Sequence, residues 1–295
     1  MAESYTLANG DVVFILPRGG ELFPQLLTRV DADALVRLEQ CAKRWPLENG
    51  DIQAELDVSI FQNPGTVHWL VCETAFFHSM PADSAAYALP NDIRAQGFRK
   101  YGSNGIFHQW VAEQFPAEEK IVSVCLNDSP STAAIINRSP IDTSGGYSLL
   151  DGLAGRSTCG SIDPSIVLLM ADAGCSVNEI EIALYRNSGW QAIINEDSSL
   201  MYLLRQSHGE FAEAQELLLQ EILKAIGAML ASMGGTDRIV IGCEDYGSGM
   251  SFANQLQARV SMITTQFSYL EFKYEEIVQS IIRQNIGIKL PLPRI

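Results

Sequence analysis

The sequence predicts an α/β protein. Short apolar runs rich in β-branched residues alternate along the chain with amphipathic helical patterns, the order that α/β folds require. The 295 residues are enough for one large or two medium domains, each with its own core, and we expect two lobes. Only 19% of the residues are charged, against about a quarter in typical soluble domains. We therefore expect part of the apolar surface to lie in a subunit interface.

Five apolar runs have the composition of β-strands, because Val, Ile and aromatic residues dominate them and polar or glycine-rich segments flank them. They occupy residues 11–16, 66–73, 120–128, 131–137 and 237–244. Apolar residues also recur every three or four positions from 210 to 233, which predicts a long helix, and Gly234 supplies a left-handed stop. This helix leads directly into the last predicted strand.

Two further helices are predicted from their start signals. Asp163 can cap free backbone N–H groups, and Pro164 fits the first turn of a helix, where its missing donor costs nothing. Ser176 and Glu179 have the three-residue spacing of a capping box, which predicts the next helix. We expect that helix to end at Gly189.

The formal net charge of −15 produces a field that repels phosphate backbones and anionic lipid surfaces. We therefore expect no nucleic-acid partner and no membrane association. The longest apolar runs fall far short of the ~20 residues of a membrane-spanning helix, and the first residues lack a signal-peptide pattern, so we expect a cytoplasmic protein. The six cysteines and four histidines form no ligand motif, which predicts reduced thiols and no metal site built from protein side chains alone.

Residues 141–170 combine glycines, hydroxyls and an arginine, as a phosphate site does. Glycines let a backbone approach a ligand closely, hydroxyls donate to phosphate oxygens, and Arg156 could form two parallel hydrogen bonds with them. The same segment also suits simple architecture, with Asp142 tying a turn to its own backbone. The pattern alone leaves both readings open.

The order of residues in this segment resembles the acetate kinase family, whose members carry DTSMGxTPLEGLxMGTRSGDIDP before a helix. Residues 142–144, Gly146, 150–153, Gly160 and 162–164 keep that frame without a gap. Further matches cover most of the chain in order: residues 15–23 resemble RVVHGGEKF, 72–81 resemble FDTAFHQTMP, 100–115 resemble RYGFHGTSHKYVAER, 126–131 stand where the family has LGNGAS, and 210–242 resemble the last helix and strand.

The resemblance implies the ribonuclease-H-like, actin-like ATPase fold, in which a nucleotide cleft lies between two α/β lobes. It implies a shortened first lobe in residues 1–78, completed by a C-terminal helix at 272–295, and a second lobe in residues 79–271. It also implies the family chemistry, in which the γ-phosphoryl group of ATP passes with Mg²⁺ to acetate or another short carboxylate to give an acyl phosphate. The second lobe would form a homodimer.

The family's catalytic positions are altered in this sequence. Glu73 stands at the catalytic aspartate and keeps its charge on a longer side chain, which positioning-dependent catalysis tolerates poorly. Asn104 replaces a transition-state histidine, and Arg18 replaces a second histidine. The arginine of GTRSG aligns with Thr158, and Arg156 lies two residues upstream. The candidate catalytic residues are Arg18, Glu73, Asn104 and Arg156.

The positions that handle nucleotide have changed as well. Asn127 and Ser129 replace the glycines of LGNGAS and crowd two backbone approaches, while Ser131 is retained. Segment 242–251 replaces the family's GIGENS loop, and its acidic residues 244–245 disfavour ATP. The candidate cofactor-binding residues are Asn127, Ser129, Ser131, Thr158, Gly242 and Gly247.

Three readings of the function follow. In the first, an acetate-kinase-like protein with weak or lost kinase activity keeps its fold for a binding or regulatory role, since scaffold residues survive where phosphate-handling residues do not. In the second, an active phosphotransferase uses a rearranged site on a different carboxylate or acyl phosphate, and its four candidate catalytic residues converge on one cleft. In the third, a partner subunit supplies strands to the first lobe, whose sheet then has an unpaired edge.

Overall fold

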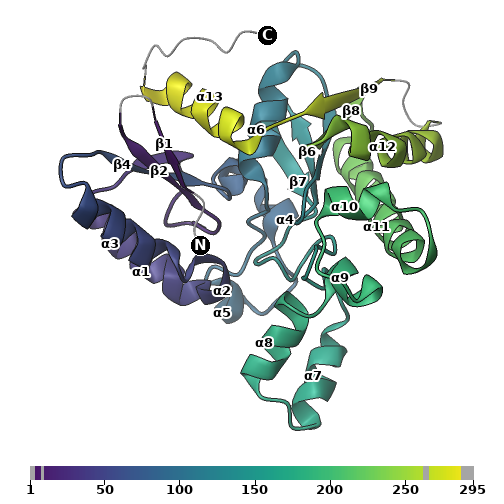
Figure 1. Ribbon diagram of the computed structural model, residues 1–295, viewed down its shortest axis with the longest axis horizontal. Coiled ribbons are helices and arrows are strands. Elements are labelled where there is room, and N and C mark those ends of the chain that lie inside the picture. The colour runs from purple at the N-terminus through teal and green to yellow at the C-terminus, as the bar shows by residue number, and fades with distance from the viewer. Residues whose placement is uncertain (1–3, 8–9, 262–265, 287–295) are drawn as a thin grey trace. The chain divides into compact units, whose positions relative to one another are not determined.

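The protein was analysed as a computed structural model, which describes residues 4–7, 10–261 and 266–286. The chain divides into two compact units, drawn in Figure 1. Unit 1 comprises residues 1–79, 103–110 and 273–295, and unit 2 comprises residues 80–102 and 111–272. Each unit contains one β-sheet with helices packed against it, so the α/β class is confirmed.

Unit 1 has a four-stranded sheet in the order β1-β2-β4-β3. The strands are β1 (Ser4–Thr6), β2 (Val12–Leu16), β3 (Leu27–Arg29) and β4 (His68–Cys72). The two central strands, β2 and β4, are parallel, with Leu16 opposite Cys72, and the short edge strands β1 and β3 are antiparallel to them. The two central strands match the predicted strands at 11–16 and 66–73.

The described residues of unit 1 also form five helical elements that lie wholly within it. They are α1 (Ala32–Arg44), α2 (Pro46–Asn49), α3 (Ile52–Gln62), the 3-10 turn η1 (Phe76–Ser79) and α13 (Tyr274–Ile286). Asp31 begins α1 by accepting the Ala34 N–H at 2.8 Å, and α3 contacts both α1 and β2. In Figure 1, α13 is drawn on the side of the sheet opposite α1 and α3. The part of the predicted C-terminal helix after residue 286 lies outside the described residues.

Unit 2 has a five-stranded sheet in the order β7-β6-β5-β8-β9. Its strands are β5 (Ile121–Leu126), β6 (Ser131–Ile136), β7 (Ser139–Thr143), β8 (Arg238–Cys243) and β9 (Phe267–Glu271). The strands β5, β8 and β9 are parallel, and β6 is antiparallel to both of its neighbours. Every residue of the central strand β5 is buried, as its unbroken apolar run requires. The predicted strands at 120–128, 131–137 and 237–244 are confirmed.

The main core of unit 2 lies between this sheet and its helices. The long helix α11 (Gly209–Met233) contacts β5, β6 and β7, and α12 (Tyr246–Val260) contacts β8 and β9. Leu218 and Ile222 of α11 are buried with Val122 and Val124 of β5 in one apolar cluster. Gly234 ends α11 with a left-handed φ of +64°, as predicted. The smaller helices of unit 2 are α4 (Ala82–Ala85), α5 (Asn91–Arg94), α9 (Gly189–Ile194) and α10 (Leu200–Arg205), and α6 (Gly105–Gln114) begins in unit 1 and ends in unit 2.

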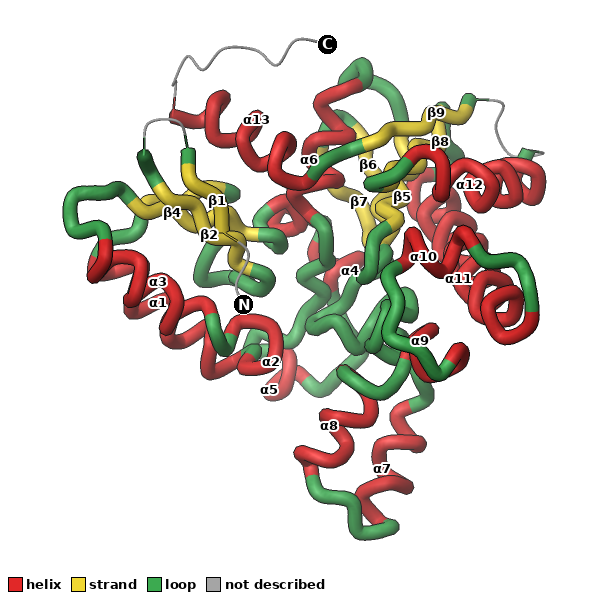
Figure 2. The backbone as a smooth tube through the Cα atoms, in the orientation of Figure 1, coloured by secondary structure: helices red, strands yellow, loops and turns green. Residues whose placement is uncertain are grey.

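The capped helices of unit 2 are α7 (Pro164–Asp172) and α8 (Val177–Tyr185), which follow the long loop region at residues 144–163, green in Figure 2. Asp163 accepts the Ser165 N–H at 2.8 Å, and the capping box at the start of α8 is present. The predicted end of α8 at Gly189 is wrong. The helix ends at Tyr185, and Gly189 instead begins α9. Glycine is required there, because its φ is +66° and a Cβ would lie 2.0 Å from the Gly155 carbonyl oxygen.

No helix among the described residues is long and apolar enough to cross a membrane.

Candidate functional site

Unit 1 brings Arg18 and Glu73 to the same edge of its sheet. Both residues follow the carboxyl ends of neighbouring parallel strands, and the Glu73 N–H donates to the Leu16 carbonyl at 3.0 Å. Open α/β sheets bind their ligands at this edge, outside the carboxyl ends of the strands. The sheet therefore gives these two candidates a suitable location.

The carboxylate of Glu73 binds the first turn of α6. The side-chain Oε2 of Glu73 accepts the Ile106 N–H at 3.2 Å, and the backbone carbonyl of Glu73 accepts the Gly105 N–H at 3.0 Å. A negative charge is favourable at a helix N-terminus, where backbone N–H groups have no partner within the helix. Asn104 directly precedes α6, with a left-handed φ of +52° and only 9% of its surface exposed. The structure therefore brings Glu73 and Asn104 together at the start of α6. The Glu73 carboxylate binds a backbone N–H group of this helix.

The loop that contains Arg18 is held by side chains of unit 1. Arg18 is 1% exposed, and its backbone exchanges two hydrogen bonds with the Asn49 side chain, at 3.1 and 2.7 Å. The N–H groups of Gly19 and Gly20 both donate to Thr74 Oγ1, at 3.1 and 3.2 Å. Successive backbone N–H groups of this kind can bind an anion. Here the Thr74 hydroxyl accepts both.

In unit 2, the turn after β5 contains the first group of cofactor candidates. The Asn127 side-chain oxygen accepts the Ser129 N–H at 3.0 Å, and Ser131 is the buried first residue of β6. Between them, Asp128 Oδ1 accepts the Leu200 N–H, at the start of α10, at 2.7 Å. An acidic side chain thus takes a backbone donor at the carboxyl end of a central strand.

Arg156 binds two acidic residues from separate parts of unit 2. Its Nη1 lies 3.1 Å from Asp128 Oδ2, while its Nε and Nη2 lie 2.7 and 2.6 Å from Asp197 Oδ1. The hydrogen bonds that Arg156 donates to Asp197 and, to a smaller extent, to Asp128 raise the pKa of the Arg156 guanidinium. These contacts hold Arg156 at the turn after β5. Thr158 is 9% exposed, and its carbonyl accepts the Gly155 N–H at 3.1 Å.

The turn after β8 repeats this arrangement. Gly242 lies in β8, and Gly247 is the second residue of α12. Asp245 caps α12 by accepting the Gly247 N–H at 3.1 Å, accepts the Ser248 hydroxyl, and pairs with Arg205 at 2.6 Å. The bonds from Ser248 and Arg205 lower the pKa of the Asp245 carboxyl to about 2. Helix α10 is therefore tied at both ends, to the turn after β5 through Asp128 and to the turn after β8 through Asp245.

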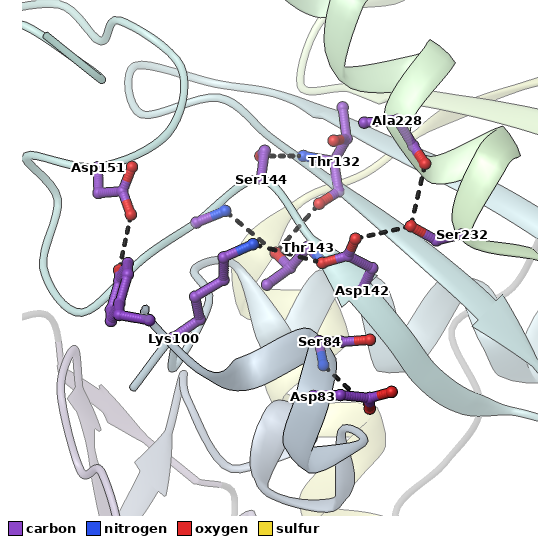
Figure 3. Close-up of polar contacts among 12 residues, drawn as sticks. Asp83, Ser84, Lys100, Thr132, Asp142, Thr143, Ser144, Asp151, Ala228 and Ser232 are labelled. Carbon is purple, nitrogen blue, oxygen red and sulfur yellow. Dashed lines mark hydrogen bonds and ion pairs between the residues drawn. The ribbon is translucent and has the colours of Figure 1, made fainter. Parts of the chain in front are cut away.

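The hydroxyl groups of Thr143, Ser144 and Ser232 form hydrogen bonds within the fold around β7, as Figure 3 shows. Thr143 Oγ1 donates to the Thr132 carbonyl at 3.1 Å, and Ser144 Oγ accepts the Thr132 N–H at 2.9 Å. Asp142 Oδ2 accepts the Ser232 hydroxyl of α11 at 2.7 Å. These bonds join β7 to β6 and to α11. The hydroxyl groups in this part of the segment therefore stabilise the fold through hydrogen bonds to other parts of the chain.

Asp151 anchors the middle of the same loop. Its carboxylate accepts the Tyr87 hydroxyl at 2.6 Å and the Ser161 hydroxyl at 2.7 Å. A Cβ on Gly146 would lie 2.1 Å from Asp151 Oδ2. The steric requirement explains why glycine occupies this position in the loop.

The histidines and cysteines give no sign of a metal site. No group of three or more potential ligands comes together among the described residues, and the six cysteines are free. His108 is fully buried, with edge contacts to the rings of Phe77 and Phe107. Burial lowers the pKa of His108 to about 3, so its neutral ring is part of the core.

Sequence reasoning missed Asp128, Asp197 and Arg205, which bind the candidate Arg156 or the acidic Asp245. Glu73, Asp128 and Asp245, which we call the strand-end acids, follow β4, β5 and β8. Each accepts a backbone N–H group at or next to the start of a helix. Asp128 lies two residues after the end of β5, inside the stretch predicted as a strand, whereas Asp197 and Arg205 carry no local signal. Whether Arg18, Glu73, Asn104 and Arg156 share one cleft stays a prediction.

Comparison with known proteins identifies relatives over most of the chain. The family model described as the Acetokinase family matches residues 12–258. The chain is 33% identical over 285 residues to the acetate kinase of Methanosarcina barkeri, a match that covers 92% of this chain and 68% of that protein. It is 32% identical over 234 residues to the acetate kinase of Halothermothrix orenii, covering 75% of this chain and 58% of that protein. The chain therefore spans little more than half the length of several curated relatives.

Solved structures share the fold. A propionate kinase from Francisella tularensis matches with a TM-score of 0.81 and 23% identity, covering 90% of this chain and 76% of that one. The acetate kinase of Porphyromonas gingivalis matches with a TM-score of 0.80 and 21% identity, covering 96% and 80%. These matches confirm the predicted actin-like ATPase fold, and the chain belongs to the acetokinase family.

Proposed function

We propose that this chain is an acetate-kinase-like protein whose kinase activity is weak or lost and whose fold serves a binding or regulatory role. The observation that carries the proposal is the set of strand-end acids. All three carboxylates accept backbone N–H groups, and Asp128 and Asp245 also bind arginines. Phosphate groups bind to proteins through the same two kinds of donor. Phosphoryl transfer depends on such groups being placed around the transferred phosphate.

The residues in place do not fit a nucleotide phosphate as they stand. Acetate kinases use ATP with Mg²⁺, and Mg²⁺ is usually held by one or two carboxylates together with substrate phosphates. In this chain, Asp128 and Asp245 are each bound to an arginine. Their carboxylates would repel a phosphate unless they moved away. We therefore derive no catalytic step through ATP or Mg²⁺.

Calorimetric titration of the purified chain with ATP and ADP, each with and without Mg²⁺, tests this proposal. We expect no heat at millimolar nucleotide, and no acyl phosphate from acetate or propionate in a hydroxamate assay. The acetate kinase of Methanosarcina thermophila, 33% identical over 215 residues, serves as the active control. Turnover as fast as that of the control enzyme would contradict the proposal and support a phosphotransferase with a rearranged site, in which Glu73 and Arg156 would be the first residues to mutate.

We also propose that unit 2 forms a homodimer through α7 and α8. No residue of α7 is buried, although Leu168 and Leu169 are large and apolar, with 70% and 67% of their surface exposed. Val177 at the start of α8 is 79% exposed. A second copy of this surface would bury these side chains, and acetate kinases are typically dimeric. We also propose a cytoplasmic location, which is consistent with the six free cysteines.

The measured mass in solution tests the dimer. Leu168→Glu combined with Val177→Glu introduces two charges on this surface, and we expect a monomer by light scattering. Phe61→Glu is the matched control, because Phe61 of unit 1 is also apolar and is 86% exposed. A dimer that survives the first change, or dissociates equally with the second, would contradict the proposal. A partner that completes the sheet of unit 1 would instead appear as a second component purified with the chain.

A further inference from the structure

A depression on the surface of unit 2 combines two arginines with apolar walls. Its volume is about 360 Å³, and among the residues that the structure describes its charged lining consists of Arg94 and Arg99, with no acidic residue. The rest of the lining is Asn91, Phe98 and four alanines, which belong to α4, α5 and the segments after them. The chain as a whole has 35 acidic residues against 20 basic ones. The depression is therefore opposite in charge to the chain, and it attracts small anions.

We propose that this depression binds a small aromatic carboxylate. The guanidinium groups of Arg94 and Arg99 bind the carboxylate group, and Phe98 and the alanines contact the ring. The depression shares no residue with the candidate catalytic and cofactor-binding positions. The inference therefore holds whether or not the chain has kinase activity.

Backbone contacts hold the two sides of the depression together. The Lys100 N–H donates to the Ala85 carbonyl at 2.8 Å, and Ala86 forms an antiparallel bridge with Arg99. These contacts join the segment after α4 to the segment after α5, so both sides belong to one frame. A pocket that is already formed avoids the cost of ordering its walls when a ligand binds.

Neutral groups bind both arginines. Arg94 Nη2 donates to the Asn91 side-chain oxygen, and Arg99 Nε donates to the Lys100 carbonyl at 3.3 Å. Arg94 forms no ion pair with any residue that the structure describes. The neighbouring ammonium group of Lys100 is instead paired with Asp142 at 3.7 Å (Figure 3). A carboxylate ligand therefore meets a guanidinium group at Arg94 whose charge no acid of the described chain neutralises. Arginine suits this role because its planar group binds both oxygens of a carboxylate.

The apolar walls favour a ligand with one ring. The ring of Phe98 is tilted against the ring of Tyr147, with 5.1 Å between their centroids, and Ala85 is 2% exposed. Aromatic rings stack on other rings and on guanidinium groups, and both surfaces are present here. Ligand pockets range from about 300 to about 1,000 Å³, so a depression of about 360 Å³ is at the small end of that range. A single ring with its carboxylate matches this size and this lining.

Titration of the chain with benzoate at constant ionic strength, followed by the NMR signals of the ligand, tests the proposal. We expect saturable binding of benzoate and none of benzamide, which has the same ring without the charge. Arg94→Gln and Arg99→Gln should each weaken benzoate binding about tenfold, as the loss of a hydrogen bond to a charged group does. Arg29→Gln is the matched control, because Arg29 is an exposed arginine of β3 in unit 1. That variant should keep the affinity of the wild type.

Two further measurements test the apolar walls. Inorganic phosphate is an anion without a ring, and we expect it to bind this depression more weakly than benzoate does. Ala86→Leu places a larger side chain in the lining and keeps both arginines, so it should also weaken benzoate binding. Ala86 is exposed and has an extended backbone, with φ −78° and ψ 144°, which leucine adopts without strain.

Several results would overturn the proposal. They are no binding of benzoate by the wild type, equal affinities for benzoate and benzamide, phosphate binding as tight as benzoate binding, and an equal loss in Arg29→Gln. Unchanged benzoate affinity in a folded Arg94→Gln variant would assign the binding to another part of the chain and would also overturn it. Circular dichroism establishes folding. If the arginine variants unfold, Ala86→Leu decides, and benzoate affinity equal to that of the wild type then contradicts the proposal. Acyl phosphate turnover tests the proposed function and has no bearing on this result.

Discussion

The two sheets hold the groups at their carboxyl edges in different ways. In unit 1, Arg18 and Asn104 are 1% and 9% exposed, and the Glu73 carboxylate binds a backbone N–H group. In unit 2, Asp128 and Asp245 keep 44% and 38% of their side chains exposed, and both bind arginines. Packing and backbone hydrogen bonds hold the groups at the edge in unit 1, whereas ion pairs with arginines hold many of those at the edge in unit 2. The edge in unit 1 should therefore respond to changes of shape, and the edge in unit 2 to changes of charge and salt.

The largest effect is expected from a methyl group in unit 1. A Cβ on Gly105 would lie 2.1 Å from the Glu73 carbonyl oxygen, a backbone atom that cannot move aside without losing its 3.0 Å hydrogen bond from the Gly105 N–H. We expect Gly105→Ala to lower the free energy of unfolding by about 3 kcal/mol. Urea denaturation of the variant measures this change.

Gly227→Ala in α11 of unit 2 is the control for that change. Apart from its chain neighbours and the backbone of its own helix, no atom lies within 4 Å of the position its Cβ would take, and alanine favours a helix over glycine by about 0.5–1 kcal/mol. The variant should therefore be as stable as the wild type or more stable. Equal losses in both variants would remove the steric explanation for Gly105.

The next effect concerns pH and the buried His108 of unit 1. Its pKa is about 3 in the folded state, against about 6.5 in the unfolded chain. The folded pKa is the lower one, so stability is full above pH 6.5 and falls as acid protonates the unfolded chain first. We expect a loss of about 2 kcal/mol between pH 7 and pH 5 from this group. Urea denaturation at a series of pH values should give a flatter profile for His108→Phe, and an unchanged profile would contradict this assignment.

The smallest effect is expected at the turn after β8 in unit 2. Asp245→Asn keeps a helix-capping side chain but loses the charge that pairs with Arg205. Because the folded pKa of Asp245 is about 2, below its unfolded value of about 3.9, the charge stabilises the fold above that value. The contribution is lost as pH falls toward 2.

Thermal melting in low and high salt measures the role of this charge. Salt screens exposed charges, so we expect the difference in melting temperature between wild type and Asp245→Asn to shrink at 1 M NaCl. Asp57→Asn in α3 of unit 1 is the control, since Asp57 is exposed and has no ion pair among the described residues. A salt-independent difference for Asp245 would contradict the view that charge holds this edge.

The sequence predicted the central parts of the fold well. All five predicted strands are present, because buried strands produce apolar runs that are easy to recognise. The four edge strands β1, β3, β7 and β9 were missed, since they are short and contain partly exposed residues, which leaves little pattern. The end of α8 was misplaced at Gly189 because a glycine also permits a close approach between distant segments, here with Gly155. Local sequence does not distinguish the two uses of glycine.

The candidate site was harder to predict. Family motifs led to Arg156, but its partner Asp197 is 41 residues away, and only the folded loop brings them together. The Leu200 N–H, which binds Asp128 from 72 residues away, leaves no mark in a sequence because every residue except proline has such a group. Comparison of motifs finds a site position at which the family's residue has been replaced. It does not show which residues from distant parts of the chain bind the replacement.

The attachment of α10 at both ends has a mechanical consequence. A helix of six residues is a stiff rod about 9 Å long, and its two ends are joined to the turns that follow β5 and β8. A displacement of one turn is therefore transmitted to the other, so the two strand ends move as one linked part. Lengthening this rod by one residue would rotate its far end by about 100° and uncouple the two turns without touching either carboxylate.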